Sequence, residues 1–217
     1  MEHFFQKGAK MKRILCFGDS NTWGYRPDGK GRFDIPSTWP GILAINLEGK
    51  ATIEIDGLCG RTTCIPDHVE GEHLNGAAYL LPCLVAQSPL DMVILKLGCN
   101  DQKSRFNMSG IDIAQSIARL VKIILNSGVN QGKAPKVLVI QPAPIKLRSF
   151  AETFKGAPER AEGMTEAFAR EMAALGVDLI NEGDFVESSE VDGIHLELDA
   201  HATMGEVVTR KVNEILF

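Results

Sequence analysis

The sequence contains few cysteines, and none of them form a pair with metal-binding or redox spacing. The five cysteines are scattered along the chain, at Cys16, Cys59, Cys64, Cys83 and Cys99. An odd number without any C-x-x-C pair argues against a disulfide framework, a zinc ribbon and a thioredoxin-like motif. We therefore expect free thiols that pack inside a protein from a reducing compartment.

The sequence also lacks an excess of positive charge and any long apolar run. Its 23 lysines and arginines are outnumbered by 28 aspartates and glutamates, which gives a net charge of −5. This composition offers no basic surface for nucleic acid or for an anionic membrane. No segment reaches the roughly 18 apolar residues of a membrane span, and the first ten residues lack the apolar stretch of a secretory signal. We expect a cytoplasmic protein with no nucleic-acid and no membrane partner.

Apolar runs of strand length alternate with helical patterns over most of the 217 residues. The expected strands are Arg13–Phe17, Thr52–Ile55, Asp91–Leu97, Lys136–Ile140 and Val177–Ile180. The expected helices are Thr38–Leu47, Ala77–Ala86, Ile111–Leu125, Pro158–Leu175 and Asp199–Leu216. This alternation predicts an α/β protein, a flavodoxin-like three-layer α/β/α fold with a five-stranded parallel sheet. We expect one domain over residues 12–217, after a loose N-terminal extension over residues 1–11.

The loop after the first expected strand reads FGDSNTWG over residues 17–24. Ligands of parallel sheets bind outside the carboxyl ends of the strands, where this loop lies. A serine at such a strand-to-helix turn, here Ser20, exposes its hydroxyl group and a backbone N–H that can stabilise a negative oxygen. The string also fits an ordinary turn, because glycine, aspartate, serine and asparagine all favour turns.

Three later loops carry residues that complement this serine. Gly60 follows the second expected strand and allows close approach of a backbone N–H to an anion. Asn100 follows the third strand, where its side-chain amide can donate into a cleft or cap a turn. Asp192 precedes His195 by three residues, so its carboxylate can accept from the Nδ1–H and leave Nε2 to face a serine. Each of these loops alone also fits a structural role.

The four loops together resemble the SGNH hydrolases, also called GDSL esterases. The family's GDS(L) string appears as GDSN at residues 18–21, and its G-x-N-D and D-x-x-H strings appear at residues 98–101 and 192–195. The family's glycine matches Gly60, and Asn21 replaces the leucine of the family name. The resemblance spans residues 12–217 and is greatest to the small arylesterase and acyltransferase branch.

The resemblance implies a serine esterase that cleaves short-chain carboxylic esters through an acyl-serine, with acyl transfer as a related reaction. Ser20 would be the nucleophile, His195 its base and Asp192 the acid that orients the imidazole. The oxyanion hole would comprise the N–H groups of Ser20 and Gly60 and the side-chain amide of Asn100. No metal and no cofactor are needed for this chemistry.

The pocket and the quaternary structure are less well specified by the sequence. We expect Trp23, in preference to Phe150 and Phe154, to line the acyl pocket together with Ile194. Residues 143–163 are expected to form a lid or a contact in a homo-oligomer, and a long surface excursion before a helix stays open as the alternative. Two alternatives stay open: a carbohydrate O-acetyl esterase, and a flavodoxin-like module that binds a nucleotide or flavin. The nucleotide- or flavin-binding alternative lacks support, because the loop after the first expected strand has no glycine-rich phosphate-binding string.

The remaining polar residues of these loops are expected to have structural roles. Asp19 and Asp101 are interpreted as carboxylates that accept from backbone N–H groups in their own loops. His68 and His73 fit a solvated loop, because their spacing of five does not match one face of a helix. His201 is expected to cap the last helix or to lie at the surface.

Overall fold

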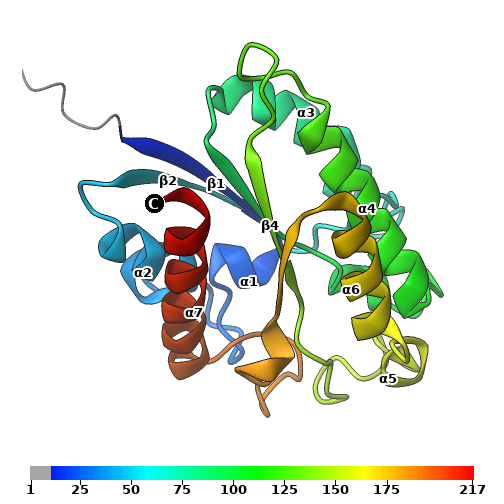
Figure 1. Ribbon diagram of the computed structural model, residues 1–217. Helices are drawn as coiled ribbons and strands as arrows, with labels where there is room; N and C mark the ends of the chain where they lie inside the picture. The colour runs from blue at the N-terminus through cyan, green and yellow to red at the C-terminus, as the bar shows by residue number, and fades with distance from the viewer. Residues whose placement is uncertain (1–10) are drawn as a thin grey trace, which may run out of the picture.

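The computed structural model describes residues 11–217 and has three layers, a parallel sheet between two layers of helices (Figure 1). The strands are β1 (Lys12–Gly18), β2 (Ala51–Gly57), β3 (Met92–Lys96), β4 (Lys136–Gln141) and β5 (Asp178–Asn181). The helices are α1 (Ser20–Trp23), α2 (Trp39–Asn46), α3 (Gly76–Gln87), α4 (Gly110–Leu125), α5 (Ala157–Arg160), α6 (Met164–Leu175) and α7 (Leu198–Leu216). Short 3-10 turns are η1 (Ile35–Ser37), η2 (Glu72–Leu74), η3 (Asn100–Gln102) and η4 (Glu182–Asp184). No helix in this range is both long and apolar enough to cross a membrane.

The sheet has the strand order β2-β1-β3-β4-β5, and every pair is parallel. The chain moves from β1 outward to β2 and then crosses back to place β3 on the other side of β1. The loops that follow β1 and β3 therefore separate at this point, which is where doubly wound sheets form their binding crevices. The predicted α/β fold with five parallel strands is confirmed. The predicted extension over residues 1–11 falls, except for Met11, outside the described residues.

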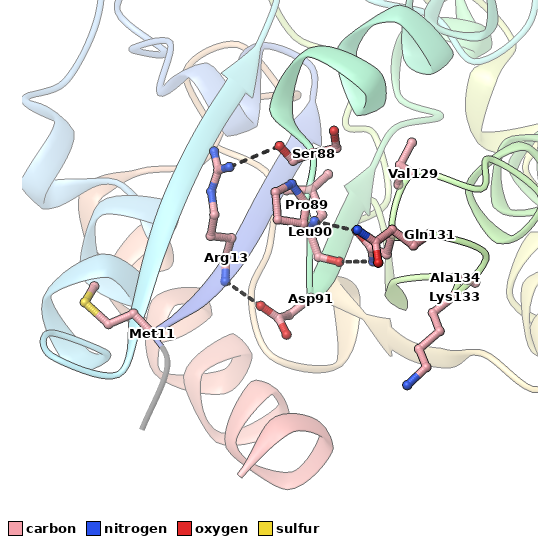
Figure 2. Close-up of a pocket in the computed structure, with 11 residues that line it drawn as sticks. Met11, Arg13, Ser88, Pro89, Leu90, Asp91, Val129, Gln131, Lys133 and Ala134 are labelled. Atoms are coloured by element: carbon pink, nitrogen blue, oxygen red, sulfur yellow. Dashed lines mark hydrogen bonds between the residues drawn. The ribbon is translucent and has the colours of Figure 1, made fainter. Parts of the chain in front are cut away.

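A cavity of about 590 Å³ opens at the amino ends of the strands, away from the loops that carry the sequence motifs (Figure 2). The backbone N–H of Arg13 donates to the Asp91 carboxylate over 2.9 Å, and the Arg13 guanidinium reaches the carbonyl oxygen of Ser88 over 3.5 Å. The Asn130 side chain pairs with both backbone groups of Leu90, at 2.9 and 2.5 Å. These bonds join the segments that enter β1, β3 and β4, so we interpret this end of the sheet as structural.

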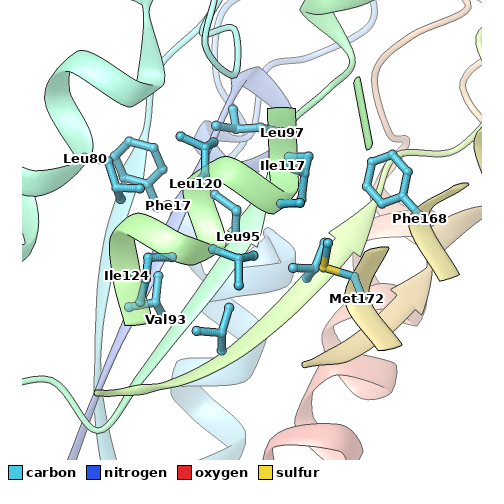
Figure 3. Packing of buried hydrophobic residues seen from close by; sticks show 14 of the residues in the cluster. Phe17, Leu80, Val93, Leu95, Leu97, Ile117, Leu120, Ile124, Phe168 and Met172 are labelled. Atoms are coloured by element: carbon cyan, nitrogen blue, oxygen red, sulfur yellow. The ribbon is translucent and has the colours of Figure 1, made fainter. Parts of the chain in front are cut away.

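Each face of the sheet is covered by a separate apolar cluster. On one face Leu95 packs among residues of α4 and α6 that include Ile117 and Phe168 (Figure 3). On the other face Ile94 packs among residues of α2 and α7 that include Met204. Since neighbouring side chains of a strand point to opposite faces, two covered faces require the continuous apolar runs seen in the sequence.

The helix expected over Pro158–Leu175 is two helices, α5 and α6, so that prediction was wrong. The break lies at Gly163, which has a φ of +74° in the left-handed region and precedes the first residue of α6. Pro158 fits the first turn of α5, because proline lacks the N–H that a first turn leaves unbonded. The helical spacing of apolar residues continues across the break and hides it in the sequence.

Candidate active site

Ser20 lies where β1 ends and α1 begins. Asp19 caps this short helix by accepting the backbone N–H of Asn21 over 3.0 Å. The preceding Gly18 has no room for a side chain, since a Cβ there would lie 2.0 Å from Thr22 Oγ1 and 2.8 Å from the Lys96 carbonyl oxygen. The turn thus brings the first helical residue against the sheet edge, with its side chain directed into a cavity.

Ser20, His195 and Asp192 form one continuous chain of hydrogen bonds. The Oγ of Ser20 lies 2.9 Å from His195 Nε2, and His195 Nδ1 lies 2.6 Å from Asp192 Oδ2. The three residues are separated by up to 175 positions in sequence, so only the fold brings them together. This arrangement allows the imidazole to accept the serine proton while the carboxylate holds its other nitrogen.

The loop that carries the histidine is folded around its aspartate. Asp192 Oδ1 accepts the N–H groups of Ile194 and His195 over 2.9 and 3.0 Å. Burial acts to raise the pKa of Asp192, but the His195 ring and these N–H groups outweigh it and hold the pKa below its ordinary value. Asp192 is therefore a carboxylate at neutral pH. Gly193, with a φ of +83°, allows the tight turn between Asp192 and His195.

Asn21 joins this loop to the serine helix. Its Nδ2 donates to the carbonyl oxygen of Ile194 over 3.2 Å, and its Oδ1 accepts the N–H of Leu196 over 3.0 Å. The side chain is buried, and the two bonds fix the loop on both sides of His195. From the sequence alone, Asn21 is recognised only as a replacement for the leucine of the family name. Its role depends on a partner 173 residues away, for which one sequence gives no signal.

Three donors of the predicted oxyanion hole line the same cavity as the Ser20 side chain. Within residues 11–217, the backbone N–H groups of Ser20 and Gly60 have no acceptor. Gly60 has a φ of +83°, a conformation that other residues rarely adopt. Asn100 Nδ2 donates to the Arg61 carbonyl oxygen over 3.1 Å, which orients the amide and leaves its second hydrogen for a ligand.

Arg61 was not singled out in the sequence, although its side chain is buried at the carboxyl ends of β1 and β2. Its guanidinium donates to the carbonyl oxygens of Gly18 and Asp56 over 2.9 and 2.7 Å. It also lies 4.1 Å from the centre of the Phe17 ring. These contacts hold the loop with Gly60 against the end of β1.

The Asp101 carboxylate bonds to the loop after β2, whereas the sequence interpretation placed its partners in its own loop. Its carboxylate accepts the backbone N–H of Thr63 over 3.0 Å and the Thr63 hydroxyl. Burial raises the pKa of Asp101 to about 6 despite these bonds. The residue thereby connects the loops that carry Gly60 and Asn100, which are two of the expected oxyanion donors.

The cavity beside Ser20 has a volume of about 160 Å³. Its lining consists of Ser20, Cys59, Gly60, Glu70, Asn100, Lys103, Phe150, Thr153, Phe154, Ile194 and His195. Ile194 lines it as expected, but Trp23 does not. The Trp23 ring instead lies 6.3 Å from Tyr25 and 5.0 Å from the Arg32 guanidinium. The expectation failed because α1 ends at Trp23, where the ring packs on Tyr25 and Arg32 of the following loop.

Residues 143–163 supply one wall of this cavity in the same chain. Phe150 meets the His195 ring edge to face at 6.4 Å between centroids. Phe154 packs in a small buried cluster with Cys99 and Ile194. The Ser104 N–H donates to the carbonyl oxygen of Thr153 over 2.7 Å and fixes the segment to the loop after β3. A further role of this segment in contacts between subunits stays a prediction.

His201 is buried, which corrects its expected placement at the surface. Its Nδ1 accepts the backbone N–H of Trp39 over 3.2 Å at the start of α2. Burial lowers its pKa to about 3, helped by the nearby charge of Lys96. His68 and His73 lie exposed in their loop, as the sequence indicated.

Comparisons with known proteins agree with this geometry. A model of the GDSL-like lipase/acylhydrolase family matches residues 16–202. The aryl esterase of M. smegmatis has a TM-score of 0.89 and 35% identity, over 94% of this chain and 100% of its own. Est24, a carbohydrate acetylesterase from Sinorhizobium meliloti, has a TM-score of 0.89 and 32% identity over the same shares of the two chains.

A curated relative, the acetylxylan esterase of Xylanibacter ruminicola, is 24% identical over 92% of this chain. The chain spans 43% of the length of that relative. The family match covers both ends of the predicted site, from the strand before Ser20 to the start of the last helix. The resemblance inferred from four loops is thus confirmed, and the chain belongs to the GDSL-like lipase/acylhydrolase family.

Proposed function

We propose that this protein is a serine hydrolase of small carboxylic esters that acts through an acyl-serine intermediate. The observation that carries the proposal is the hydrogen-bonded chain Ser20–His195–Asp192 at the edge of a cavity. Family membership and the esterase names of the structural relatives support it. Asp192, which is ionised at neutral pH, suits the role of orienting the imidazole and stabilising its cation.

The mechanism follows from the hydrogen bonds. Ser20 Oγ attacks the ester carbonyl carbon while its proton moves to His195 Nε2. The carbonyl oxygen becomes an oxyanion, which the N–H groups of Ser20 and Gly60 and the Asn100 amide stabilise. His195 then gives the proton to the departing alcohol, which leaves an acyl group on Ser20. Water, activated by His195, attacks this acyl-serine, and the acid product departs with regeneration of the serine hydroxyl.

The size and lining of the cavity support a short acyl chain. Its volume of about 160 Å³ is small for a binding pocket, and Phe150, Phe154 and Ile194 make one side apolar. An acetyl or similarly short group fits this space. An apolar wall would also shelter the acyl-serine from water, which favours transfer to an alcohol when one is present.

A carbohydrate O-acetyl esterase is the second candidate. Glu70 and Lys103 add polar groups to the lining of the cavity, and such groups can bond to sugar hydroxyls. One structural relative is named a carbohydrate acetylesterase, and the curated relative is named an acetylxylan esterase. A panel of acetylated sugars and aryl acetates separates the candidates, since the preferred class should show the larger kcat/KM.

The non-enzymatic alternative, a module that binds a nucleotide or flavin, has less support. The loop after β1 holds a serine bonded to a histidine where such modules hold a phosphate. Purified protein without flavin absorbance and without affinity for nucleotides would disfavour this alternative further.

Replacement of the nucleophile tests the proposal. Ser20→Ala should abolish hydrolysis of p-nitrophenyl acetate and leave the circular dichroism spectrum and the unfolding midpoint near wild type. Ser104→Ala, at an exposed serine outside the cavity, is the matched control and should keep full turnover. Retained turnover in Ser20→Ala would refute the assignment of the nucleophile.

We also infer a cytoplasmic location and a homo-oligomer for this enzyme. All five cysteines are free thiols, which suits a reducing compartment. Light scattering on the purified protein tests the oligomer, and a mass equal to one chain would contradict it.

A further inference from the structure

A lysine is buried in the interior behind the serine turn. Lys96 is the last residue of β3 and is 1% exposed. Its ammonium bonds to the Glu182 carboxylate over 2.9 Å, and Glu182 is equally buried. The same Glu182 oxygen accepts the N–H of Ala143 over 3.0 Å, so the ion pair joins the ends of β3, β4 and β5.

This ion pair occupies a position where the sheet is otherwise apolar. Met92 and Ile94 precede Lys96 on the same face of β3, which packs against α2 and α7. A buried ion pair seldom stabilises a fold more than well-packed apolar residues of the same volume. Stability alone therefore gives little reason for a lysine here, and its neighbours point to another role.

Those neighbours include the residue that caps the serine helix. Lys96 pairs in register with Gly18 of β1, and Asp19 is the next residue. Asp19 is 1% exposed and uses Oδ1 to cap α1, while its Oδ2 has no partner within residues 11–217. Among the described residues, Glu182 Oε1 and His201 Nε2 are likewise buried without hydrogen-bond partners. We call Asp19, Lys96, Glu182 and His201 the buried polar cluster.

We propose that Lys96 is a positioning residue, which keeps the Asp19 carboxylate charged so that Asp19 holds the first turn of α1 and presents Ser20 to His195. The inference rests on the proposed function, because it concerns how the serine is aligned. Lys96 touches neither the substrate nor the reacting atoms and acts through Asp19.

The charges in the buried polar cluster support this role. Burial raises the pKa of Asp19, and the ammonium of Lys96 is the strongest influence that opposes the rise. Burial acts to lower the pKa of Lys96, but the charges of Glu182 and Asp19 outweigh it, so the ammonium persists. Other titratable groups that face the cluster are His195, Cys59, Cys99 and Asp101. Without the lysine, burial and the Glu182 charge would raise the pKa of Asp19 further and favour its protonated form.

A protonated Asp19 would cap α1 more weakly. A hydrogen bond to an ionised acceptor is roughly twice as strong as one between neutral groups. Loss of that difference would loosen the turn that sets the 2.9 Å contact between Ser20 and His195. The expected effect is a lower kcat with an unchanged KM, and it should depend on pH because it follows the protonation of Asp19.

The double variant Lys96→Met/Glu182→Leu tests the proposal while leaving no unpaired charge from the ion pair. We expect it to fold and to lose kcat about tenfold at mildly acidic pH, with recovery as the pH rises and Asp19 ionises. Lys96→Arg, which keeps the charge, should retain the pH profile of the wild type. A folded double variant with the wild-type kcat and pH profile would overturn the proposal.

Asp19→Asn provides a second test that leaves the buried ion pair in place. This variant mimics the protonated carboxyl, so kcat should fall about tenfold at every pH, without the recovery expected of the double variant. Full activity in Asp19→Asn would overturn the proposal even if the double variant did not fold. Labelling of Ser20 by a fluorophosphonate separates this proposal from the proposed function. If the wild type is labelled but the variants keep the wild-type kcat and pH profile, only the role of Lys96 is refuted. If Ser20 of the wild type is not labelled, the proposed function itself is refuted.

Discussion

The side chains around Ser20 are oriented by bonds that leave one group free for the substrate. The Asn100 amide donates one hydrogen to the Arg61 carbonyl oxygen, and its second hydrogen remains for an oxyanion. His195 bonds to Asp192 through Nδ1, and its Nε2 remains for the serine. Such orientation before the substrate arrives is what makes an oxyanion hole effective.

Asn100→Ala should lower kcat about 100- to 1,000-fold with little change in KM, because the amide stabilises charge that develops only in the transition state. Steady-state kinetics on p-nitrophenyl acetate measures this loss. Asn126→Ala, at an exposed residue after α4, is the matched control. A variant of Asn100 that loses less than about threefold would show that the amide is not part of the oxyanion hole.

The sequence could predict those site residues whose role is indicated by the spacing of nearby residues. Asp192 and His195 lie three apart on one loop, and Ser20 follows a buried strand directly. Residues that act through distant partners could not be found this way. Asn21 bonds to a loop far along the chain, and the choice of Phe150 over Trp23 depends on how residues 143–163 fold back over the site.

At the scale of elements, α1 and the loop 192–195 behave as one unit. Asn21 bonds to the backbone on both sides of His195, and the loop is closed by its own aspartate. The distance between the serine and the imidazole is therefore set by the contact between these two elements.

Asn21→Ala should both destabilise the protein and slow hydrolysis. The change leaves the buried Ile194 carbonyl and the Leu196 N–H without partners, at a cost of about 1–3 kcal/mol for each. Urea unfolding measures the stability, and kcat on an aryl acetate measures the alignment. Asn46→Ala, at an exposed residue whose amide bonds to Glu206 and Thr209 of α7, should cost no more than about 1 kcal/mol of stability and should leave kcat unchanged. Wild-type values for the Asn21 variant would mean that the loop is held by other contacts.

Gly193→Ala should destabilise the protein by about 3 kcal/mol or more and abolish most activity. A Cβ at this position would lie 1.7 Å from the Lys146 carbonyl oxygen, in a backbone conformation with a φ of +83°. Gly128→Ala is the matched control, since Gly128 also has a positive φ, +67°, but no atom lies near its missing side chain. The control should lose only about 1–2 kcal/mol. Equal losses in the two variants would contradict the steric explanation.

The strands were the most predictable elements, and the division between α5 and α6 was the least predictable feature. The five apolar runs of the sequence correspond to the five strands, because a strand covered on both faces of the sheet needs apolar side chains on both faces. The break at Gly163 was missed because one glycine within an otherwise helical pattern is compatible with either a continuous helix or two.

At the scale of the whole molecule, a buried neutral histidine couples folding to pH. His201 has a folded pKa of about 3, whereas an unfolded histidine has one near 6.5. Between these values the unfolded chain binds a proton that the folded protein excludes. The contribution of His201 to stability is complete above about pH 6.5 and is lost as the pH falls towards about 3.

His201→Gln should therefore make the free energy of unfolding less dependent on pH. The wild type should lose up to about 1.4 kcal/mol per pH unit more than the variant as the pH falls below neutral. Urea unfolding at a series of pH values measures the difference. His68→Gln, at an exposed histidine, should keep the steeper dependence of the wild type. Parallel curves for the wild type and His201→Gln would contradict the neutral state of this buried ring.

The whole-molecule topology explains why the site lies at one end of the sheet only. The four motif loops all follow strands or lie beside their carboxyl ends, whereas the wider cavity at the amino ends has none of the predicted site residues. The sequence predicted the fold class and this shared edge. It could not predict the strand order, which determines that the loops with Gly60 and Asn100 lie on opposite sides of β1.

Covalent labelling with a fluorophosphonate, mapped by peptide mass, tests the central claim most directly. We expect a single label on Ser20 in the wild type, strongly slowed labelling in His195→Ala, and none in Ser20→Ala. A label on another residue, or labelling of Ser20 at an unchanged rate in His195→Ala, would contradict the claim that the imidazole activates this serine.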